Sequence, residues 1–201
     1  MNKSLERFKQ SIDKTRNLHN LYVHLKDEKG FEHILISDIL RSEIVYAIAA
    51  LDRLVHDLVL VGIIDIFSGT RLETPSYNNL NINLLQQKAL KDSTIPEIEL
   101  KQIIIDKHKY LAFQEPEKIT NALSIINSEQ HKWQVISDSI SLPMNDVKVQ
   151  LKNIIIRRNQ IVHESDIDLL SGTELPILRS DVEEIIIFIE KIGTAIYNLV
   201  K

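Results

Sequence analysis

The stretch Ser37-Asp-Ile-Leu-Arg-Ser-Glu-Ile-Val-Tyr-Ala-Ile-Ala-Ala-Leu-Asp-Arg-Leu-Val-His-Asp-Leu-Val-Leu-Val-Gly-Ile-Ile-Asp-Ile-Phe67 decides the fold. Its apolar residues recur every three or four positions, which is the period of one face of an α-helix. Ser37 and Asp38 are residue types that favour the N-cap, so the sequence predicts a helix over 39–67 that begins after them. The apolar stripe consists of Ile44, Ala47, Ile48, Leu51, Leu54, Val55, Leu58 and Val59.

The composition around this helix favours an all-α protein. Its 201 residues include only 5 Gly, 5 Pro and one Trp, whereas turn-rich β architectures need many more chain breakers. A chain of this length can bury one substantial core, and no linker or repeat divides it. The sequence therefore predicts a single domain over 1–201, built as a helical bundle without a sheet.

Further helices are expected on both sides of the central one. Pro96 and Pro116 stand where a first helical turn tolerates proline, and Ser180-Asp181 with Glu183 resembles a capping box. A surface loop is expected over 68–79, because turn-forming residues interrupt the apolar pattern there. The additional helices are predicted over about 5–26, 82–90, 96–113, 116–138, 146–164 and 180–199.

Composition also limits the classes of function. The chain has no cysteine, so thiolate metal sites and disulfides are excluded, and its histidines lack the spacing of a zinc site. No Gly-rich loop follows a strand, so neither a cofactor nor a metal is expected. The net charge of -4 requires any contact with nucleic acid to be made by a local basic patch. A charged N-terminus and short apolar runs predict a soluble, cytoplasmic protein without membrane contact.

The segment Leu151-Lys-Asn-Ile-Ile-Ile-Arg-Arg-Asn-Gln-Ile-Val-His-Glu-Ser-Asp166 carries the candidate chemistry. On a helical wheel Arg158 falls in the middle of an apolar stripe. His163 lies on the flank of that stripe and shares a face with Asn159, one turn earlier. A cation, an amide and an imidazole beside an apolar surface suit a phosphate ester. The stripe is formed by Leu151, Ile154, Ile155, Ile161 and Val162.

Several segments together resemble the HEPN superfamily (higher eukaryotes and prokaryotes nucleotide-binding), specifically its RiboL-PSP branch. They are the Arg158 segment with its acidic exit over 164–168, the helix over 38–57, the loop over 67–75, and the section over 113–119 with Trp133. The resemblance implies an all-α bundle, frequently a homodimer, that acts on RNA as a metal-independent endoribonuclease. It also implies a role in bacterial defence, stress or toxin–antitoxin systems, with an antitoxin or defence-system partner. Arg158, Asn159 and His163 correspond to the arginine, polar residue and histidine of the family motif.

The residue types support this reading independently. RNA cleavage without a metal uses the 2′-hydroxyl as nucleophile, so the protein must grip the phosphate and move protons. Arg158 can bind the phosphate with its guanidinium, and His163 can act as acid or base. Asn159 can orient either of these two side chains. On one helix Arg158 and His163 point about 140° apart, so a two-fold dimer is expected to form a shared cleft.

A structural explanation of the same residues stays open. Arg158 would then be a buried cation paired with an acid, and His163 a helix-end residue favoured by the helix dipole. The corresponding function is a catalytically silent, dimeric module that binds a partner, a nucleotide or RNA. DNA binding is disfavoured by the negative net charge.

Four more residues are candidates for a supporting or RNA-contacting role. Arg157 is expected to be solvated, or to contact a phosphate outside the active centre. Arg41, Asp52 and His56 fall on one flank of the helix over 39–67. Asp52 either orients Arg158 or His163, or belongs with its neighbours to a polar border between packed helices. The basic cluster over 107–109 is expected to be a solvated helix face.

Overall fold

The computed structural model describes residues 1–168 and 170–201, and these residues form nine α-helices and one π-helical segment without a strand. The prediction of an all-α fold is confirmed. The elements are α1 (Asn2–Val23), η1 (His24–Glu28), α2 (His33–Phe67), α3 (Pro75–Asn78), α4 (Leu84–Asp92), α5 (Pro96–His108), α6 (Pro116–Ser124), α7 (Lys132–Ser139), α8 (Met144–Glu164) and α9 (Arg179–Val200).

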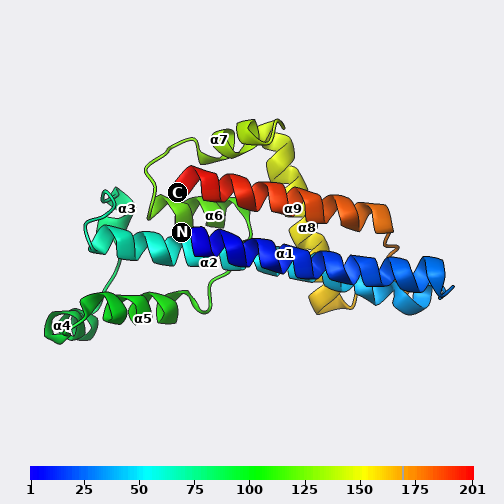
Figure 1. Cartoon of the computed structure of the whole chain (residues 1–201), viewed down its shortest axis with the longest axis horizontal. Coiled ribbons are helices and arrows are strands. Elements are labelled where there is room, and N and C mark those ends of the chain that lie inside the picture. Colours follow the sequence, from blue (N-terminus) through cyan, green and yellow to red (C-terminus); the bar gives the residue numbers. More distant parts are fainter. Residues whose placement is uncertain (169) are drawn as a thin grey trace.

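Helix α2 is the central element of the molecule, and α1 and α9 run along it (Figure 1). Leu51, Val55 and Leu58 of its apolar stripe are completely buried. The prediction that Ser37 and Asp38 cap this helix was wrong, because α2 begins at His33. Ser37 is instead buried inside the helix, where its hydroxyl donates to the carbonyl of Ile34 at 3.3 Å.

Helices α1 and α9 both pack on α2 and also contact each other, so the three helices form a bundle (Figure 1). The chain reverses between α1 and α2 at Gly30, whose φ of 69° is easily adopted only by glycine. The ring of Phe8 from α1 lies directly against Gly193 of α9, where no side chain intervenes. This close approach brings the first and last helices together, and the two chain ends lie near each other in Figure 1.

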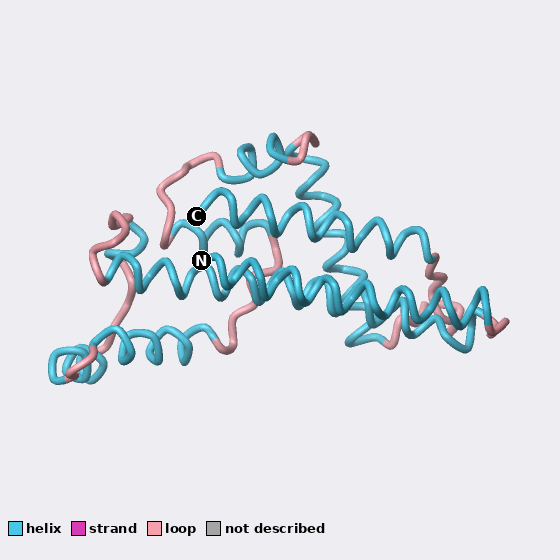
Figure 2. Tube along the Cα trace, in the orientation of Figure 1, coloured by secondary structure: helices cyan, strands magenta, loops and turns pink. Residues whose placement is uncertain are grey.

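Helices α6 and α8 pack against α2, and α7 packs against α9. The boundaries of these helices differ from expectation in one place. The helix predicted over 116–138 is divided into α6 and α7 by an irregular segment, as Figure 2 shows. The predicted positions of Pro96 and Pro116 in a first helical turn are confirmed. The capping box at Ser180 and Glu183 was wrong, because α9 begins at Arg179 and no side chain caps it.

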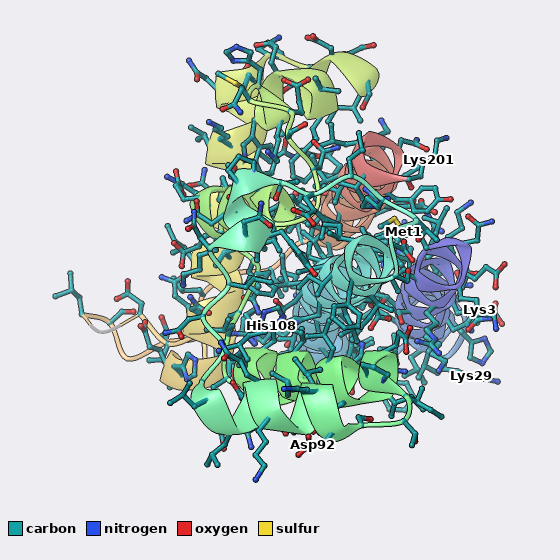
Figure 3. All side chains as sticks on the ribbon, turned by 90° about the vertical axis from the view of Figure 1, so that its left-hand side faces the viewer. Met1, Lys3, Lys29, Asp92, His108 and Lys201 are labelled. Carbon is teal, nitrogen blue, oxygen red and sulfur yellow. The ribbon has the colours of Figure 1, made fainter. Side chains whose placement is uncertain are left out.

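Helices α4 and α5 form a pair that contacts the rest of the molecule through α5 against α2. In the end-on view of Figure 3 this pair lies below α2, and His108 lies on its side nearest the core. The chain reaches the pair through the segment predicted as a loop over 68–79. That prediction was wrong in part, because the segment contains α3 and buries Thr74. Within the described residues, no helix combines the length and apolarity needed to cross a membrane.

Candidate functional site

Helix α8 carries Arg158, Asn159 and His163. Leu151, Ile154 and Ile155 bury one face of this helix in the core. The apolar stripe predicted from the sequence weakens after Arg158, because Ile161 is half-buried and Val162 is 45% exposed. The C-terminal half of α8 therefore leaves the core, and its polar side chains face solvent or a groove.

Arg158 is half-buried, and its guanidinium is incompletely satisfied. Nη1 donates to Oδ1 of Asn159 at 3.0 Å. Nε is buried and has no hydrogen-bond partner among the residues that the structure describes. None of the described carboxylates forms an ion pair with this guanidinium. An arginine keeps its charge, so this arrangement favours an anion as an additional partner.

His163 lies one residue before the end of α8 and is exposed. Asn159, one turn earlier, is exposed as well, so both side chains are accessible. Because α8 is continuous across the motif, Arg158 and His163 keep the angular separation of about 140° expected of a helix. Within one copy of the chain, these two groups do not face a common atom.

The prediction that Arg157 is solvated was wrong. Its Nη2 donates to Oδ2 of Asp166 at 2.8 Å and to the carbonyl of Pro176 at 3.0 Å. Asp166 is completely buried, and its Oδ2 also accepts from Nε of Arg41 at 2.8 Å. We call Arg41, Arg157 and Asp166 the Asp166 cluster. Arg157 and Arg41 thus hold the chain that follows α8, and their guanidiniums are engaged within the protein.

The Asp166 cluster depends on a sharp reversal after α8. Ser165 and Asp166 have φ values of 53° and 57°, a left-handed conformation that residues other than glycine rarely adopt. Arg41 extends the cluster by donating to the hydroxyl of Ser37 at 2.8 Å and to the carbonyl of Leu175 at 3.0 Å. These contacts fix the end of α8, where His163 lies, against α2.

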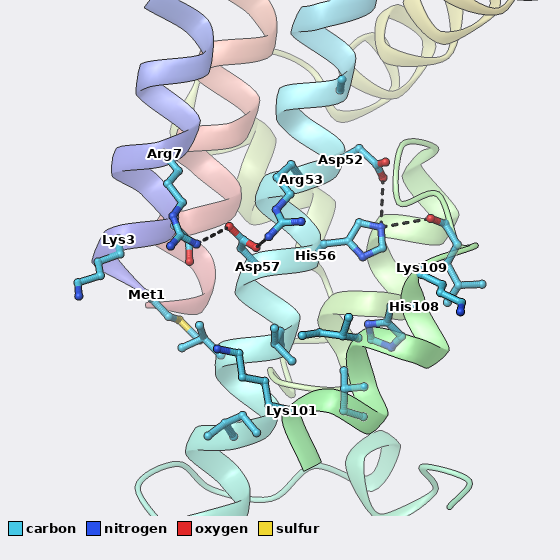
Figure 4. A pocket seen from close by; sticks show the side chains of 18 of the residues that line it. Met1, Lys3, Arg7, Asp52, Arg53, His56, Asp57, Lys101, His108 and Lys109 are labelled. Atoms are coloured by element: carbon cyan, nitrogen blue, oxygen red, sulfur yellow. Dashed lines mark hydrogen bonds and ion pairs between the residues drawn. The ribbon is translucent and has the colours of Figure 1, made fainter. Parts of the chain in front are cut away.

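Arg41 does not share a site with Asp52 and His56, although the sequence placed all three on one flank. Oδ1 of Asp52 accepts from the backbone N–H of Phe113 at 2.5 Å and lies 3.8 Å from Nε2 of His56. Nε2 of His56 lies 3.2 Å from the carbonyl oxygen of Leu111 (Figure 4). Of the two roles considered for Asp52, these contacts support the polar border, because its carboxylate holds the chain after α5 and not Arg158 or His163.

The burial of His108 was not predicted, because the residue stands between two lysines and this basic cluster was expected to be a solvated helix face. It is 8% exposed, and its ring packs edge-on against Phe113 with 5.5 Å between the ring centres. Burial lowers the pKa of His108 to about 4, so its imidazole is uncharged at neutral pH. Its apolar neighbours Ile104 and Ile105 in α5 were the available sign that this face turns inward.

A family model described as RiboL-PSP-HEPN matches residues 9–201. The chain belongs to this HEPN family. Domains of the HEPN family are generally related to ribonuclease activity or nucleotide binding. A search of curated proteins and a search of solved structures each found no match.

In this HEPN chain Arg158 lies at a groove of about 1260 Å³ that runs between α1, α2 and α5. Asp52, His56 and His108 line the same groove. The structure therefore brings Arg158 to the surroundings of Asp52 and His56, whereas Arg41 and Arg157 belong to the Asp166 cluster. Within the described part of the chain, no three His, Asp or Glu side chains gather as a metal site would require.

Proposed function

We propose that this HEPN protein is an endoribonuclease that cleaves RNA without a metal ion, with Arg158, Asn159 and His163 as its active-site residues. The observation that carries the proposal is the contrast between two neighbouring arginines. Arg157 is neutralised by the buried carboxylate of Asp166. Arg158 has a buried Nε without a partner among the described residues and borders an open groove. A phosphodiester supplies the anion that Arg158 lacks.

The proposed reaction is transfer of the phosphoryl group to the 2′-hydroxyl of the RNA. His163 accepts the proton of that hydroxyl, the 2′-oxygen bonds to phosphorus, and the bond to the 5′-oxygen breaks. Arg158 stabilises the charge that develops on the non-bridging oxygens, and Asn159 holds the guanidinium. The departing 5′-oxygen takes a proton, which leaves a 2′,3′-cyclic phosphate and a 5′-hydroxyl.

A homodimer is part of this proposal. Arg158 and His163 point about 140° apart on one helix, so one copy cannot direct both at a single phosphate. Two α8 helices related by a two-fold axis would present both pairs to one cleft. One His163 would then act as the base, and the second would protonate the leaving oxygen.

The test is cleavage of a labelled RNA by His163→Ala and Arg158→Ala variants in the presence of EDTA. We expect both to lower the cleavage rate by a factor of about 10² to 10⁴, since each removes a group that acts on the reacting atoms. His131→Ala, which alters another exposed histidine outside α8, is the matched control and should cleave normally. A folded His163→Ala protein with wild-type activity would contradict the assignment.

A silent interaction module is the second candidate, and the surface of α8 favours it. Ile156 is 56% exposed and Val162 is 45% exposed, so this helix offers apolar contacts to a partner or a second copy. On this account purified wild-type protein does not cleave RNA, and Ile156→Asp weakens self-association in sedimentation experiments. A stable monomer that cleaves RNA would exclude the dimeric module.

A further inference from the structure

The groove beside Arg158 has a charge opposite to that of the whole protein. Its lining contains six cationic and three acidic side chains, a balance of +3, whereas the complete chain has a net charge of -4. A local excess of this kind attracts a polyanion to one place on an otherwise acidic protein. The charged lining residues are Lys3, Arg7, Arg53, Lys101, Lys109 and Arg158, with Asp52, Asp57 and Asp65.

Two of the acids are occupied by contacts within the protein. Asp57 is buried and forms ion pairs with Arg53 at 2.9 Å and with Arg7 at 3.5 Å (Figure 4). Asp52 accepts from the backbone N–H of Phe113. In contrast, Lys3 and Lys101 are exposed, and no described carboxylate forms an ion pair with either. These ammonium groups are available to an external anion.

Apolar side chains line the groove together with the cations. Ile104 is buried, and Leu60, Val61 and Ile64 of α2 are half-buried where they line the groove. His108 adds an uncharged ring, because its pKa is about 4. A groove lined by both cationic and apolar side chains matches a nucleotide chain, whose phosphates are anionic and whose bases have apolar faces.

We infer that this groove binds a single-stranded segment of RNA next to the phosphate held by Arg158. A single strand is required because the base faces that meet Leu60 and Ile64 are stacked out of reach in a duplex. RNA is favoured over an acidic peptide because Arg158, which the proposed function assigns to a phosphodiester, lines the same groove, so one strand can occupy both sites. The inference rests on the proposed function in one respect only, namely that the RNA bound in the groove is the strand that is cleaved.

The experiment is binding of a short, fluorescein-labelled 2′-O-methyl RNA to the full chain, measured by anisotropy over a range of salt concentrations. This RNA has no free 2′-hydroxyl, so binding is measured without cleavage. The double variant Lys3→Glu/Lys101→Glu tests the groove. The control Lys14→Glu/Lys88→Glu changes the net charge equally at exposed positions of α1 and α4 outside the groove.

We expect the groove variant to bind RNA at least about tenfold more weakly than the control variant. Its slope of log affinity against log salt should be less negative by about 1.4, since each phosphate contact to a single strand contributes about 0.7. Circular dichroism verifies that both variants are folded. Equal affinities and equal slopes for the two double variants would overturn the inference, as would tighter binding of an acidic peptide than of RNA.

The failure of this inference is distinguishable from failure of the proposed function. If 2′-O-methyl RNA binds through Lys3 and Lys101 but ordinary RNA is never cleaved, the groove is upheld and the nuclease is rejected. If ordinary RNA is cleaved and the groove variant has an unchanged KM, the nuclease is upheld and the groove is rejected. A raised KM with an unchanged kcat for the groove variant supports both.

Discussion

The same substitution at two adjacent arginines should cost very different amounts of stability. Arg157→Ala removes one of the two guanidiniums that neutralise Asp166, a carboxylate that is completely buried. Oδ1 of Asp166 already has no partner among the described residues, so the remaining contact with Arg41 must hold it alone. Arg158→Ala removes no ion pair to a described carboxylate and only one hydrogen bond, to the exposed side chain of Asn159.

The expected magnitudes follow from these contacts. Breaking a buried ion pair by removing one partner costs about 3–5 kcal/mol, and the lower end applies to Arg157→Ala because Arg41 stays in place. For a chain of this size a loss of about 3 kcal/mol lowers Tm by about 9 °C. Arg158→Ala should cost less than about 1 kcal/mol, since exposed side-chain hydrogen bonds contribute little. Differential scanning calorimetry of both variants at neutral pH measures the difference.

Either of two results would refute the assignment of Arg157 as the arginine that stabilises the fold. Melting temperatures of Arg157→Ala and Arg158→Ala that agree within about 2 °C would mean that the Asp166 cluster contributes little to stability. A larger loss for Arg158→Ala would mean that Arg158 is the structural cation. Asp166→Asn is the matched variant at the acidic partner of the Arg157–Asp166 ion pair, because it keeps the shape of the side chain and removes its charge. It should destabilise the protein as Arg157→Ala does.

Two further predictions concern the packing of α1. Burial raises the pKa of Glu43, which contacts His19 at 2.9 Å, from 4.5 to about 7. As the pH rises, the carboxyl of Glu43 therefore loses its proton in the unfolded chain before it does so in the folded protein. The folded protein loses stability between pH 4.5 and about 7 for this reason. Glu43→Gln removes the titrating group, so it should reduce the difference in Tm between about pH 5 and about pH 8. A Cβ at Gly193 would overlap the ring of Phe8, so Gly193→Ala should cost about 1–3 kcal/mol in urea unfolding. An unchanged urea midpoint, or an unchanged pH difference in Glu43→Gln, would contradict the respective prediction.

The sequence predicted those helices whose signals are local. Apolar periodicity places the central helix over 39–67, and the structure has α2 over His33–Phe67. Prolines at first-turn positions mark the beginnings of α5 and α6 correctly, because proline lacks only an N–H that is unpaired there in any case. For these helices the periodicity and the first-turn prolines were sufficient, whereas the local capping signals at Ser37 and Ser180 were not.

The break between α6 and α7 shows where local information ends. The hydroxyl of Thr74 donates to the carbonyl of Ile125 at 2.8 Å, and Nη1 of Arg71 donates to the carbonyl of Ile126 at 3.0 Å. Nδ2 of Asn127 donates to the carbonyl of Leu199 at 3.0 Å. Side chains about fifty residues away thus satisfy the carbonyl groups at the end of α6. No residue within 116–138 indicates that these distant partners exist, so the apolar pattern of that segment predicted one continuous helix.

The candidate site divides in the same way. The position of Arg158 within the apolar stripe of α8 was evident from the sequence, since helical spacing determines it. The engagement of Arg157 was not evident, because Asp166 reaches it only through the left-handed turn at Ser165 and Asp166. Serine and aspartate give no strong signal for such a turn, whereas glycine would have done so. The single-domain organisation and the roles of Arg158, Asn159 and His163 stay predictions.

The paired arginines also explain why residue identity alone cannot assign a catalytic role in this chain. Successive helical residues point about 100° apart, so Arg157 turns toward the chain after α8 while Arg158 turns toward the groove. The buried carboxylate of Asp166 is within reach of Arg157 and neutralises it, which leaves Arg158 as the member of the pair available to a phosphate. Arg157 and Arg41 then hold the end of α8, which carries His163, so the structural arginine also determines where the proposed proton-transfer group lies. Damage to the Asp166 cluster should therefore reduce cleavage through the position of His163, whereas loss of Arg158 should reduce it in a protein whose fold and stability are nearly unchanged.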